Sequence, residues 1–131
     1  MKKINNELVS KLIEESLKFK QIGDLIKAKN CLKKALKTEP NNSIVLNNLG
    51  NIYSAKNDLI NAKKFFSKAI SIKKNYSNAI FNLALTNEEM GNKDDATKLY
   101  RNAIRYDPNN LGFYYNLSRI DETIFSEHQI N

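Results

Sequence analysis

The stretch that decides the fold reads Asn48-Leu49-Gly50-Asn51-Ile52-Tyr53, followed by Ala62, Phe66 and Ala69. The same order of small, aliphatic and aromatic residues recurs 34 positions upstream and downstream, without an insertion. A fixed period of this length indicates one supersecondary unit copied along the chain. The equivalent positions include Leu12, Leu46, Ile80 and Tyr114; Glu15, Leu49, Leu83 and Leu117; Ser16, Gly50, Ala84 and Ser118; Gly23, Asn57 and Gly91; Ala28, Ala62 and Ala96; Leu32, Phe66 and Tyr100; Ala35, Ala69 and Ala103.

Simple packing explains these columns. Small residues such as Gly50 face alanines such as Ala62 within one repeat, where two antiparallel helices must approach closely. Large residues such as Phe66 fill the space that the small ones leave. Each helix pair leaves one apolar face uncovered, so neighbouring pairs must stack to bury it. The sequence therefore predicts an all-α solenoid.

Across about residues 9–124, the columns resemble the tetratricopeptide repeat at nearly every signature site. The resemblance implies a right-handed solenoid of three helix-turn-helix repeats plus one additional C-terminal helix. With 131 residues and 41% hydrophobic content, the chain suits one domain. We predict a single domain over residues 1–131, with a frayed lead-in before Glu7, repeats at about 9–42, 43–76 and 77–110, and a fourth first helix or cap at 111–125.

The predicted last helix is apolar on more than one side. Tyr114 and Leu117 are expected to cover the end of the third repeat, but other large apolar residues point elsewhere: Phe113, Tyr115, Ile120, Ile124 and Phe125. A terminal repeat needs a polar outer face. Three interpretations stay open: the chain is a fragment of a longer protein, copies associate through this helix, or the exposure is tolerated.

The net charge of +7 raises the question of nucleic-acid or membrane binding. Eleven of the basic residues lie on the second helices, which the resemblance places on the convex outside: Lys27, Lys29, Lys33, Lys34, Lys37, Lys63, Lys64, Lys68, Lys98, Arg101 and Arg105. No aromatic residues alternate with them for base stacking. We interpret them as a solvated face and expect no nucleic-acid partner. Acidic residues at the starts of the second helices are expected to cap them and to complement the helix dipole: Asp24, Asp58, Asp94 and Asp95.

The single cysteine, Cys31, permits no intramolecular disulfide and fits a reducing compartment. No apolar run approaches the length of a membrane span. We therefore expect a cytoplasmic protein with no membrane partner.

The sequence offers no material for catalysis. Its single histidine, His128, lies in the tail, away from any candidate metal or nucleophile partner. Adjacent carboxylates such as Glu88 and Glu89 point about 100° apart on a helix and do not face each other. We predict no enzyme activity, no catalytic residue, no metal, no cofactor and no small-molecule substrate.

One column is not explained by packing. Asn48, Asn82 and Asn116 hold the same position in successive repeats, where the first repeat has Glu14. This column resembles the asparagine ladder of O-GlcNAc transferase repeats, which implies contacts to the main chain of a bound peptide. An amide suits that task because it carries a donor and an acceptor. The alternative is that asparagine, frequent in this chain, is merely tolerated there.

First helices of such repeats line the concave groove, so further groove residues are predicted to give side-chain selectivity: Asn47, Asn51, Phe81, Leu85, Tyr115 and Arg119, together with Ile13 and Leu17. The family's carboxylate clamp for chaperone C-termini needs basic residues where Ile13, Asn78 and Asn82 stand. A moderately apolar, extended peptide is the expected ligand.

We therefore predict a protein-protein interaction module that binds an extended peptide or partner segment in its groove. The alternative is an N-terminal regulatory or substrate-presenting segment of a larger enzyme, such as a sulfotransferase or glycosyltransferase. The segment Tyr115-Asn116-Leu117-Ser118-Arg119-Ile120 resembles the last repeat helix before the catalytic domain of bacterial tetratricopeptide sulfotransferases. A nucleic-acid binder using the basic face ranks third.

Overall fold

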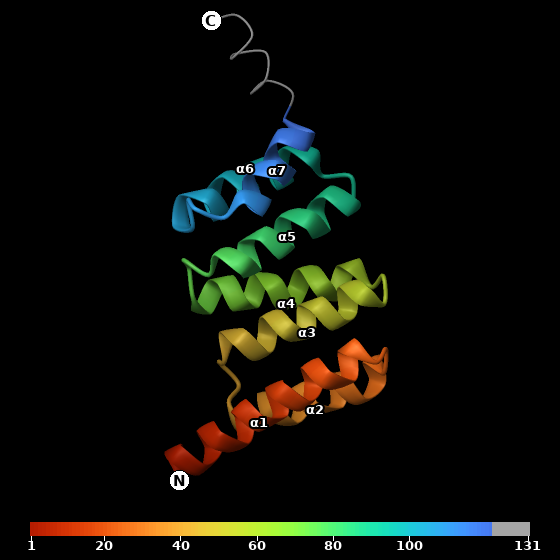
Figure 1. The fold of residues 1–131 in the computed structure, drawn as a ribbon, viewed down its shortest axis with the longest axis vertical. Helices are drawn as coiled ribbons and strands as arrows, with labels where there is room; N and C mark the ends of the chain where they lie inside the picture. Colours follow the sequence, from red (N-terminus) through yellow and green to blue (C-terminus); the bar gives the residue numbers. More distant parts are fainter. Residues whose placement is uncertain (122–131) are drawn as a thin grey trace, which may run out of the picture. The chain divides into compact units, whose positions relative to one another are not determined.

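The computed structural model describes residues 1–121, and these contain seven α-helices and no strand (Figure 1). The helices are α1 (Lys2–Gln21), α2 (Leu25–Thr38), α3 (Ser43–Ala55), α4 (Leu59–Ile72), α5 (Ser77–Glu89), α6 (Lys93–Tyr106) and α7 (Leu111–Ile120). The predicted all-α fold of helix-pair repeats with one additional helix is confirmed. Ile124, Phe125 and His128 lie outside the described residues. Within residues 1–121, no helix is both long and apolar enough to cross a membrane.

The helices form two compact units. Unit 1, Met1–Lys73, contains the antiparallel pairs α1/α2 and α3/α4, and α2 also contacts α3. Unit 2 begins at Lys74 and contains the pair α5/α6, with α7 against α6. The grouping of all repeats into one domain over residues 1–131 stays a prediction.

The turns inside the repeats use one backbone conformation. Gly23, Asn57 and Gly91 hold equivalent positions, with φ angles of 84°, 61° and 87°. Glycine adopts this left-handed conformation without steric cost, and asparagine tolerates it better than most residues. The column that marked the turns in the sequence therefore marks the places where a helix must reverse its direction.

The second helices begin with a polar cap in two repeats. The carboxylates of Asp24 and Asp58 accept hydrogen bonds from backbone N–H groups three residues further on, at 3.0 and 3.2 Å. Asn92 holds the equivalent position before α6 but makes no such bond. The predicted capping was therefore wrong for Asp94 and Asp95, which lie inside the first turn of α6. Their position there agrees with the other half of the prediction, that they complement the helix dipole.

Close helix approach is most evident in unit 1. A Cβ atom added to Gly50 would lie 2.9 Å from Cζ of the Phe66 ring and closer still to two other ring carbons. Phe66 itself is fully buried. The aromatic ring thus packs directly on the backbone of α3, as the column of small residues predicts.

Two details differ from the expectation. Helix α1 begins at Lys2, so the first residues continue the helix although all of them are exposed; no proline or glycine interrupts residues 1–22. In unit 2, Phe113 and Leu117 cover the preceding pair, whereas Tyr114 is 44% exposed. The 34-residue column favoured Tyr114, but adjacent residues on a helix point about 100° apart, and it is the Phe113 ring that packs against Phe81 of the preceding pair.

Candidate functional site

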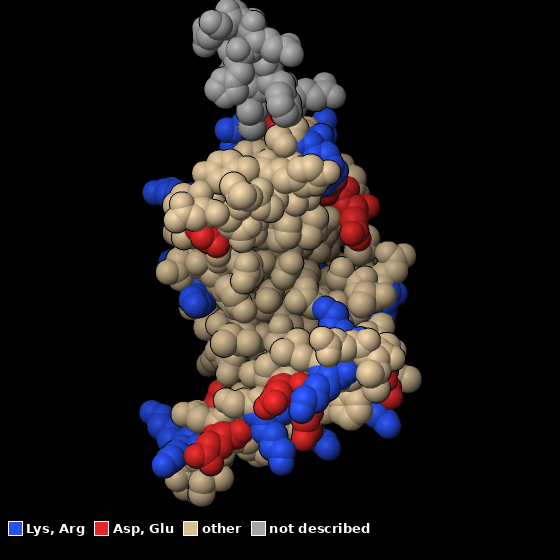
Figure 2. Space-filling view, viewed as in Figure 1, with Lys and Arg blue, Asp and Glu red and all other residues tan. Residues whose placement is uncertain are grey.

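Apart from Ile13 and Leu17 on α1, the predicted groove residues lie on first helices that carry little charge. Helix α3 has no charged residue, α7 has only Arg119, and α5 has only Glu88 and Glu89 near its end. In contrast, α1 bears a band of mixed positive and negative side chains (Figure 2). The structure places Asn47, Asn48 and Asn51 on α3 in unit 1; Phe81, Asn82 and Leu85 on α5, and Tyr115, Asn116 and Arg119 on α7, in unit 2.

Asparagine caps fix where two of these helices start. The side chain of Asn42 accepts hydrogen bonds from the N–H groups of Ile44 and Val45 at the start of α3, at 3.0 and 3.1 Å. Asn110 accepts one from Gly112 at the start of α7, at 3.0 Å. These bonds satisfy donors that a helix N-terminus leaves free. They set the register of the helices that carry the candidate site.

In unit 1, Asn48 and Asn51 border a notch of about 20 Å³ between α1 and α3, together with Ser16, Leu17 and Lys20. This space accommodates about one water molecule or the tip of a side chain. Both asparagines are partly exposed, as a groove contact requires.

Unlike Asn48 and Asn51, Asn47 does not fit the predicted role of a groove residue. Only 6% of it is exposed, so its amide is not available on the surface in this structure. The sequence pattern predicted that Asn47 faces the groove, so this burial corrects the prediction. Spacing along one helix does not fix burial, because the neighbouring helices decide which side chains they cover.

In unit 2, Phe81 is mainly a packing residue. Its ring centroid lies 5.6 Å from that of Tyr100 and 4.8 Å from that of Phe113. Leu85 packs against the same core cluster. The more exposed predicted residues of this unit are Tyr115 and Arg119.

The amide of Asn116 is already engaged locally. Its Nδ2 donates to the carbonyl of Gly112 at 2.8 Å, and its Oδ1 accepts from Nη2 of Arg119 at 3.3 Å. A bound peptide would have to exchange with these bonds. Asn116 is therefore a weaker candidate for main-chain recognition than its place in the column indicates.

Sequence reasoning missed a polar network that joins all three helices of unit 2. The guanidinium of Arg119 binds both carboxylate oxygens of Glu88, with Nη1–Oε2 at 2.6 Å and Nη2–Oε1 at 2.7 Å. The buried Tyr100 donates its hydroxyl to the same carboxylate at 2.9 Å. The only signal was an acidic and a basic residue 31 positions apart on consecutive first helices.

The network shifts the pKa of each member. Hydrogen bonds from Arg119 lower the pKa of Glu88, against the opposing effect of partial burial, and the bond from Tyr100 acts in the same direction. Burial, followed by the bond to Glu88, raises the pKa of the Tyr100 hydroxyl. At neutral pH, Glu88 and Arg119 thus form a charged pair whose charges cancel.

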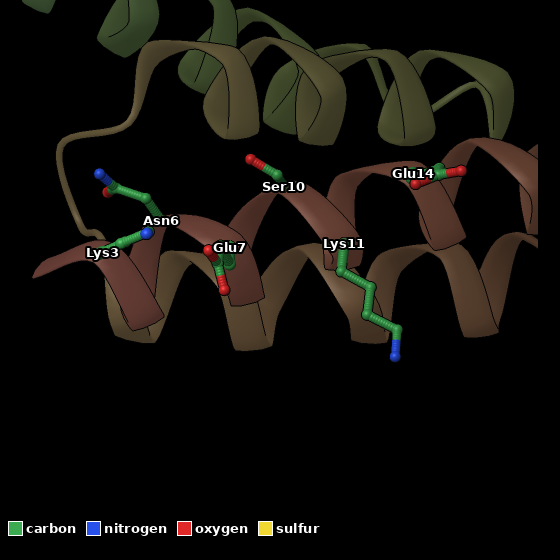
Figure 3. A pocket seen from close by; sticks show the side chains of 6 residues that line it. All are labelled: Lys3, Asn6, Glu7, Ser10, Lys11 and Glu14. Atoms are coloured by element: carbon green, nitrogen blue, oxygen red, sulfur yellow. The ribbon is translucent and has the colours of Figure 1, made fainter. Parts of the chain in front are cut away.

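The larger hollows have the character of open surface. One of about 370 Å³ follows α1 and is lined by Lys3, Asn6, Glu7, Ser10, Lys11 and Glu14. Figure 3 shows that Asn6 and Ser10 point to one side of the helix while Lys11 points to the other. These side chains do not converge on a common point, as a small-molecule site requires.

Cys31 is not an activated thiol. Partial burial, followed by the Glu15 carboxylate, raises its pKa. A reactive cysteine instead needs a lowered pKa, because the thiolate is the nucleophile. In the described part of the chain, no group of three or more potential metal ligands comes together.

Paired helices at a constant period define a helix-pair repeat protein. Residues 19–42, 31–64 and 77–110 each match a tetratricopeptide repeat family model. The chain belongs to the tetratricopeptide repeat family. No curated protein sequence matches it.

Solved structures of similar fold include the first tetratricopeptide repeat domain of Spaghetti (RPAP3) bound to the HSP90 peptide SRMEEVD. That domain is 19% identical, with 90% of this chain and 94% of that chain covered and a TM-score of 0.83. The Sgt2 domain from Aspergillus fumigatus is 24% identical, with 92% and 82% covered and a TM-score of 0.82. A mutant O-GlcNAc transferase from Thermobaculum terrenum is 16% identical, with 86% and 22% covered and a TM-score of 0.82. At these identities the likeness shows the fold.

Proposed function

We propose that this protein is an interaction module that binds an extended peptide or partner segment along its first helices. The observation that carries the proposal is the low charge of α3 in unit 1 and of α5 and α7 in unit 2, with Asn48, Asn82 and Asn116 at one repeat position. An amide can bond to both the C=O and the N–H of an extended chain, whatever its side chains. We propose no catalytic role for these residues.

Two similar structures support peptide binding as the function. The first domain of Spaghetti (RPAP3) is bound to an HSP90 peptide, and the second domain of human RPAP3 is in complex with an HSP70 peptide. These two peptides are ligands of the RPAP3 domains. For this chain we also propose peptide binding, with an extended segment held on the first helices and with a different ligand chemistry.

The ligand that we propose is neutral. The HSP90 and HSP70 peptides, SRMEEVD and SGPTIEEVD, both end in an acidic sequence. In this chain Ile13, Asn78 and Asn82 stand where the carboxylate clamp of the family needs basic residues. Arg119, the single cation of α7, is already paired with Glu88. An acidic peptide therefore finds no uncompensated positive charge on α3 or α7.

The expected affinity is modest. Each hydrogen-bonded amide contributes about 1 kcal/mol net, so three of them leave the affinity roughly micromolar or weaker once association costs are counted. Exposed side chains such as Tyr115 would add selectivity through apolar contact.

Peptide capture on a diverse immobilised library tests the proposal. The wild type is compared with Asn48→Ala, Asn82→Ala and Asn116→Ala combined, after circular dichroism confirms equal helicity. A matched control replaces three exposed asparagines elsewhere: Asn30, Asn75 and Asn102, each by alanine. We expect neutral peptides to be captured by the wild type and the control and lost in the first variant. Equal capture by all three proteins would refute main-chain recognition, and preferential capture of peptides ending in EEVD would refute a neutral ligand.

An alternative function is a regulatory or substrate-presenting segment of a larger enzyme. It is supported by the match to the O-GlcNAc transferase, of which this chain covers 22%. Determining whether the natural coding sequence continues past Asn131 into a catalytic domain tests this alternative. We also propose a cytoplasmic location, because Cys31 has no partner cysteine in the sequence; cell fractionation tests it.

A further inference from the structure

The two units differ strongly in charge. Residues 1–73 contain 15 lysines, no arginine and 6 acidic residues, a net charge of +9. Residues 74–131 contain 6 basic and 8 acidic residues, a net charge of −2. The excess positive charge of the protein therefore resides entirely in unit 1. A difference of this size between two halves points to an anionic partner for the basic half.

Within unit 1, the positive charge concentrates on the second helices. Helix α2 carries five lysines and α4 carries three, and neither contains an acidic residue. Asp24, the N-cap of α2, lies 3.8 Å from the ammonium group of Lys27, so one of these lysines has a carboxylate beside it. Solvation alone explains exposed lysines, so a second feature is needed to indicate a partner.

That second feature is a group of exposed isoleucines at one edge of unit 1. Ile22, Ile26 and Ile60 are 77%, 67% and 77% exposed. Ile22 directly follows α1, and Ile26 and Ile60 hold equivalent positions in the first turns of α2 and α4. The α1–α2 and α3–α4 turns both lie at the right-hand side of unit 1 in Figure 1. Exposed aliphatic side chains that gather at one edge mark a contact surface more often than scattered ones do.

Lysines adjoin these isoleucines. Lys29 and Lys33 follow Ile26 at spacings of three and seven residues, so all three lie on one face of α2. Lys56 directly follows α3, at the turn that leads to Ile60. The carboxylates of these turns, Asp24 and Asp58, are engaged as helix caps. We call this surface the turn edge: Ile22, Ile26, Ile60, Lys29, Lys33 and Lys56.

We infer that the turn edge docks unit 1 on an anionic lipid surface. The isoleucines enter the boundary between headgroups and acyl chains, and the lysines lie at the level of the lipid phosphates and carboxylates. Lysine suits this position because its long aliphatic stem can lie along apolar surface while the ammonium group reaches the headgroups. The expectation of no membrane partner rested on the lack of a spanning segment, and peripheral contact needs none.

The composition of the turn edge favours lipid over a protein partner. Energetic centres of protein interfaces are enriched in tryptophan, tyrosine and arginine and poor in lysine. The six residues of the turn edge are lysines and isoleucines, and the two carboxylates of the same turns, Asp24 and Asp58, cap the following helices. A membrane surface can bind both residue types, because its anionic headgroups attract lysines and the acyl chains beneath them take up isoleucines.

A nucleic-acid partner fits less well. Single-stranded nucleic acids need free aromatic faces for stacking. In unit 1 Phe65 is already stacked on Tyr53, with ring centroids 5.3 Å apart and planes 3° from parallel. Duplex phosphates could bind the lysines but would leave the isoleucines without a role.

Vesicle flotation of the full chain tests the inference. The vesicles contain either phosphatidylcholine alone or phosphatidylcholine and phosphatidylserine in equal parts. We expect binding to the mixed vesicles only. Replacing three lysines by glutamine should weaken it by about tenfold or more, since each lysine near an anionic surface contributes on the order of 1 kcal/mol; these are Lys29, Lys33 and Lys56.

Two further variants make the test specific. Replacing Ile22, Ile26 and Ile60 by serine should also weaken binding, by roughly tenfold, although the net charge is unchanged. A control removes three positive charges from α6: Lys93→Gln, Lys98→Gln and Arg105→Gln. It should keep most of the binding, and circular dichroism should show equal helicity for all variants.

Several results would overturn the inference. One is an absence of binding to the mixed vesicles. Another is equal weakening by the α6 control, which would mean that net charge alone attracts the chain. Capture of polyglutamate or duplex DNA through Lys29, Lys33 and Lys56, without vesicle binding, would assign the surface to an acidic protein or a nucleic acid instead. None of these results bears on peptide capture by the first helices, so the two proposals fail independently.

Discussion

The second and third repeats fill the same two core positions in different ways. In unit 1 these positions are Gly50 and Phe66, and in unit 2 they are Ala84 and Tyr100, all four of them buried. The second repeat places an aromatic ring directly on a bare helix backbone. The third repeat adds a methyl group to the helix and a hydroxyl to the ring, and the hydroxyl donates to Glu88.

This difference separates two ways of holding a helix pair together. The contact of the second repeat depends on volume alone, because no polar group takes part. The contact of the third repeat depends also on charge, since Glu88 is held in turn by Arg119 of the next helix. We therefore expect unit 1 to be sensitive to changes in size and unit 2 to be sensitive to pH as well.

The largest effect is expected from Phe66→Ala. Removing the ring leaves a cavity beside Gly50, which has no side chain that could fill it. Loss of a buried aromatic ring costs about 3–5 kcal/mol in the free energy of unfolding. Urea denaturation followed by circular dichroism measures it. A cost below that of a typical surface substitution would show that the ring is not the main contact of the α3/α4 pair.

A smaller effect is expected from Gly50→Ala. The new methyl group overlaps the Phe66 ring and should cost about 1–3 kcal/mol, despite the higher helix propensity of alanine. The first repeat has Ser16 and Leu32 at these positions, so the double variant Gly50→Ala, Phe66→Leu should recover part of the loss. The same denaturation assay checks both. If Gly50→Ala alone raised the stability, the close approach of α3 and Phe66 would be disproved.

The smallest effect concerns pH and unit 2. Glu88 has a lower pKa in the folded protein than its ordinary value of 4.5. Its contribution to stability is therefore full above pH 4.5 and is lost as the pH falls below that value. Because the pair with Arg119 is partly exposed, the contribution should be about 1 kcal/mol or less. Thermal unfolding at a series of pH values should show a shallower acid dependence for Glu88→Gln than for the wild type, and Glu89→Gln provides the control. Parallel pH profiles for the wild type and Glu88→Gln would contradict the prediction.

The fold was predictable because its signals are local and repeated. The period of 34 residues locates the helix pairs, and the residues at 23, 57 and 91 locate the turns that reverse them. Each of these features follows from backbone geometry or from the size of one side chain. A single sequence contains that information several times over, since every repeat shows it again.

The candidate site was only partly predictable. Asn48 and Asn82 lie on the expected helices and are partly exposed, but Asn47 is buried and Phe81 packs in the core. Such residues lie at the border of a helix face, where the neighbouring helix decides their exposure. The Glu88–Arg119 pair depends on the spacing of two first helices, which no local pattern encodes. Whether the asparagine column binds a peptide stays a prediction.

The contact between Gly50 and Phe66 constrains how copied repeats can diverge. If the repeats arose by duplication, the second could not acquire the Ala-Tyr pair of the third in any order without a cost. Alanine arriving first would meet the ring, and a tyrosine hydroxyl arriving first would find Ser54, not a glutamate, at the position equivalent to Glu88. The two repeats therefore fill the same pair of core positions in two ways that do not mix. Exchanging single residues between them should be less well tolerated than exchanging whole helix pairs.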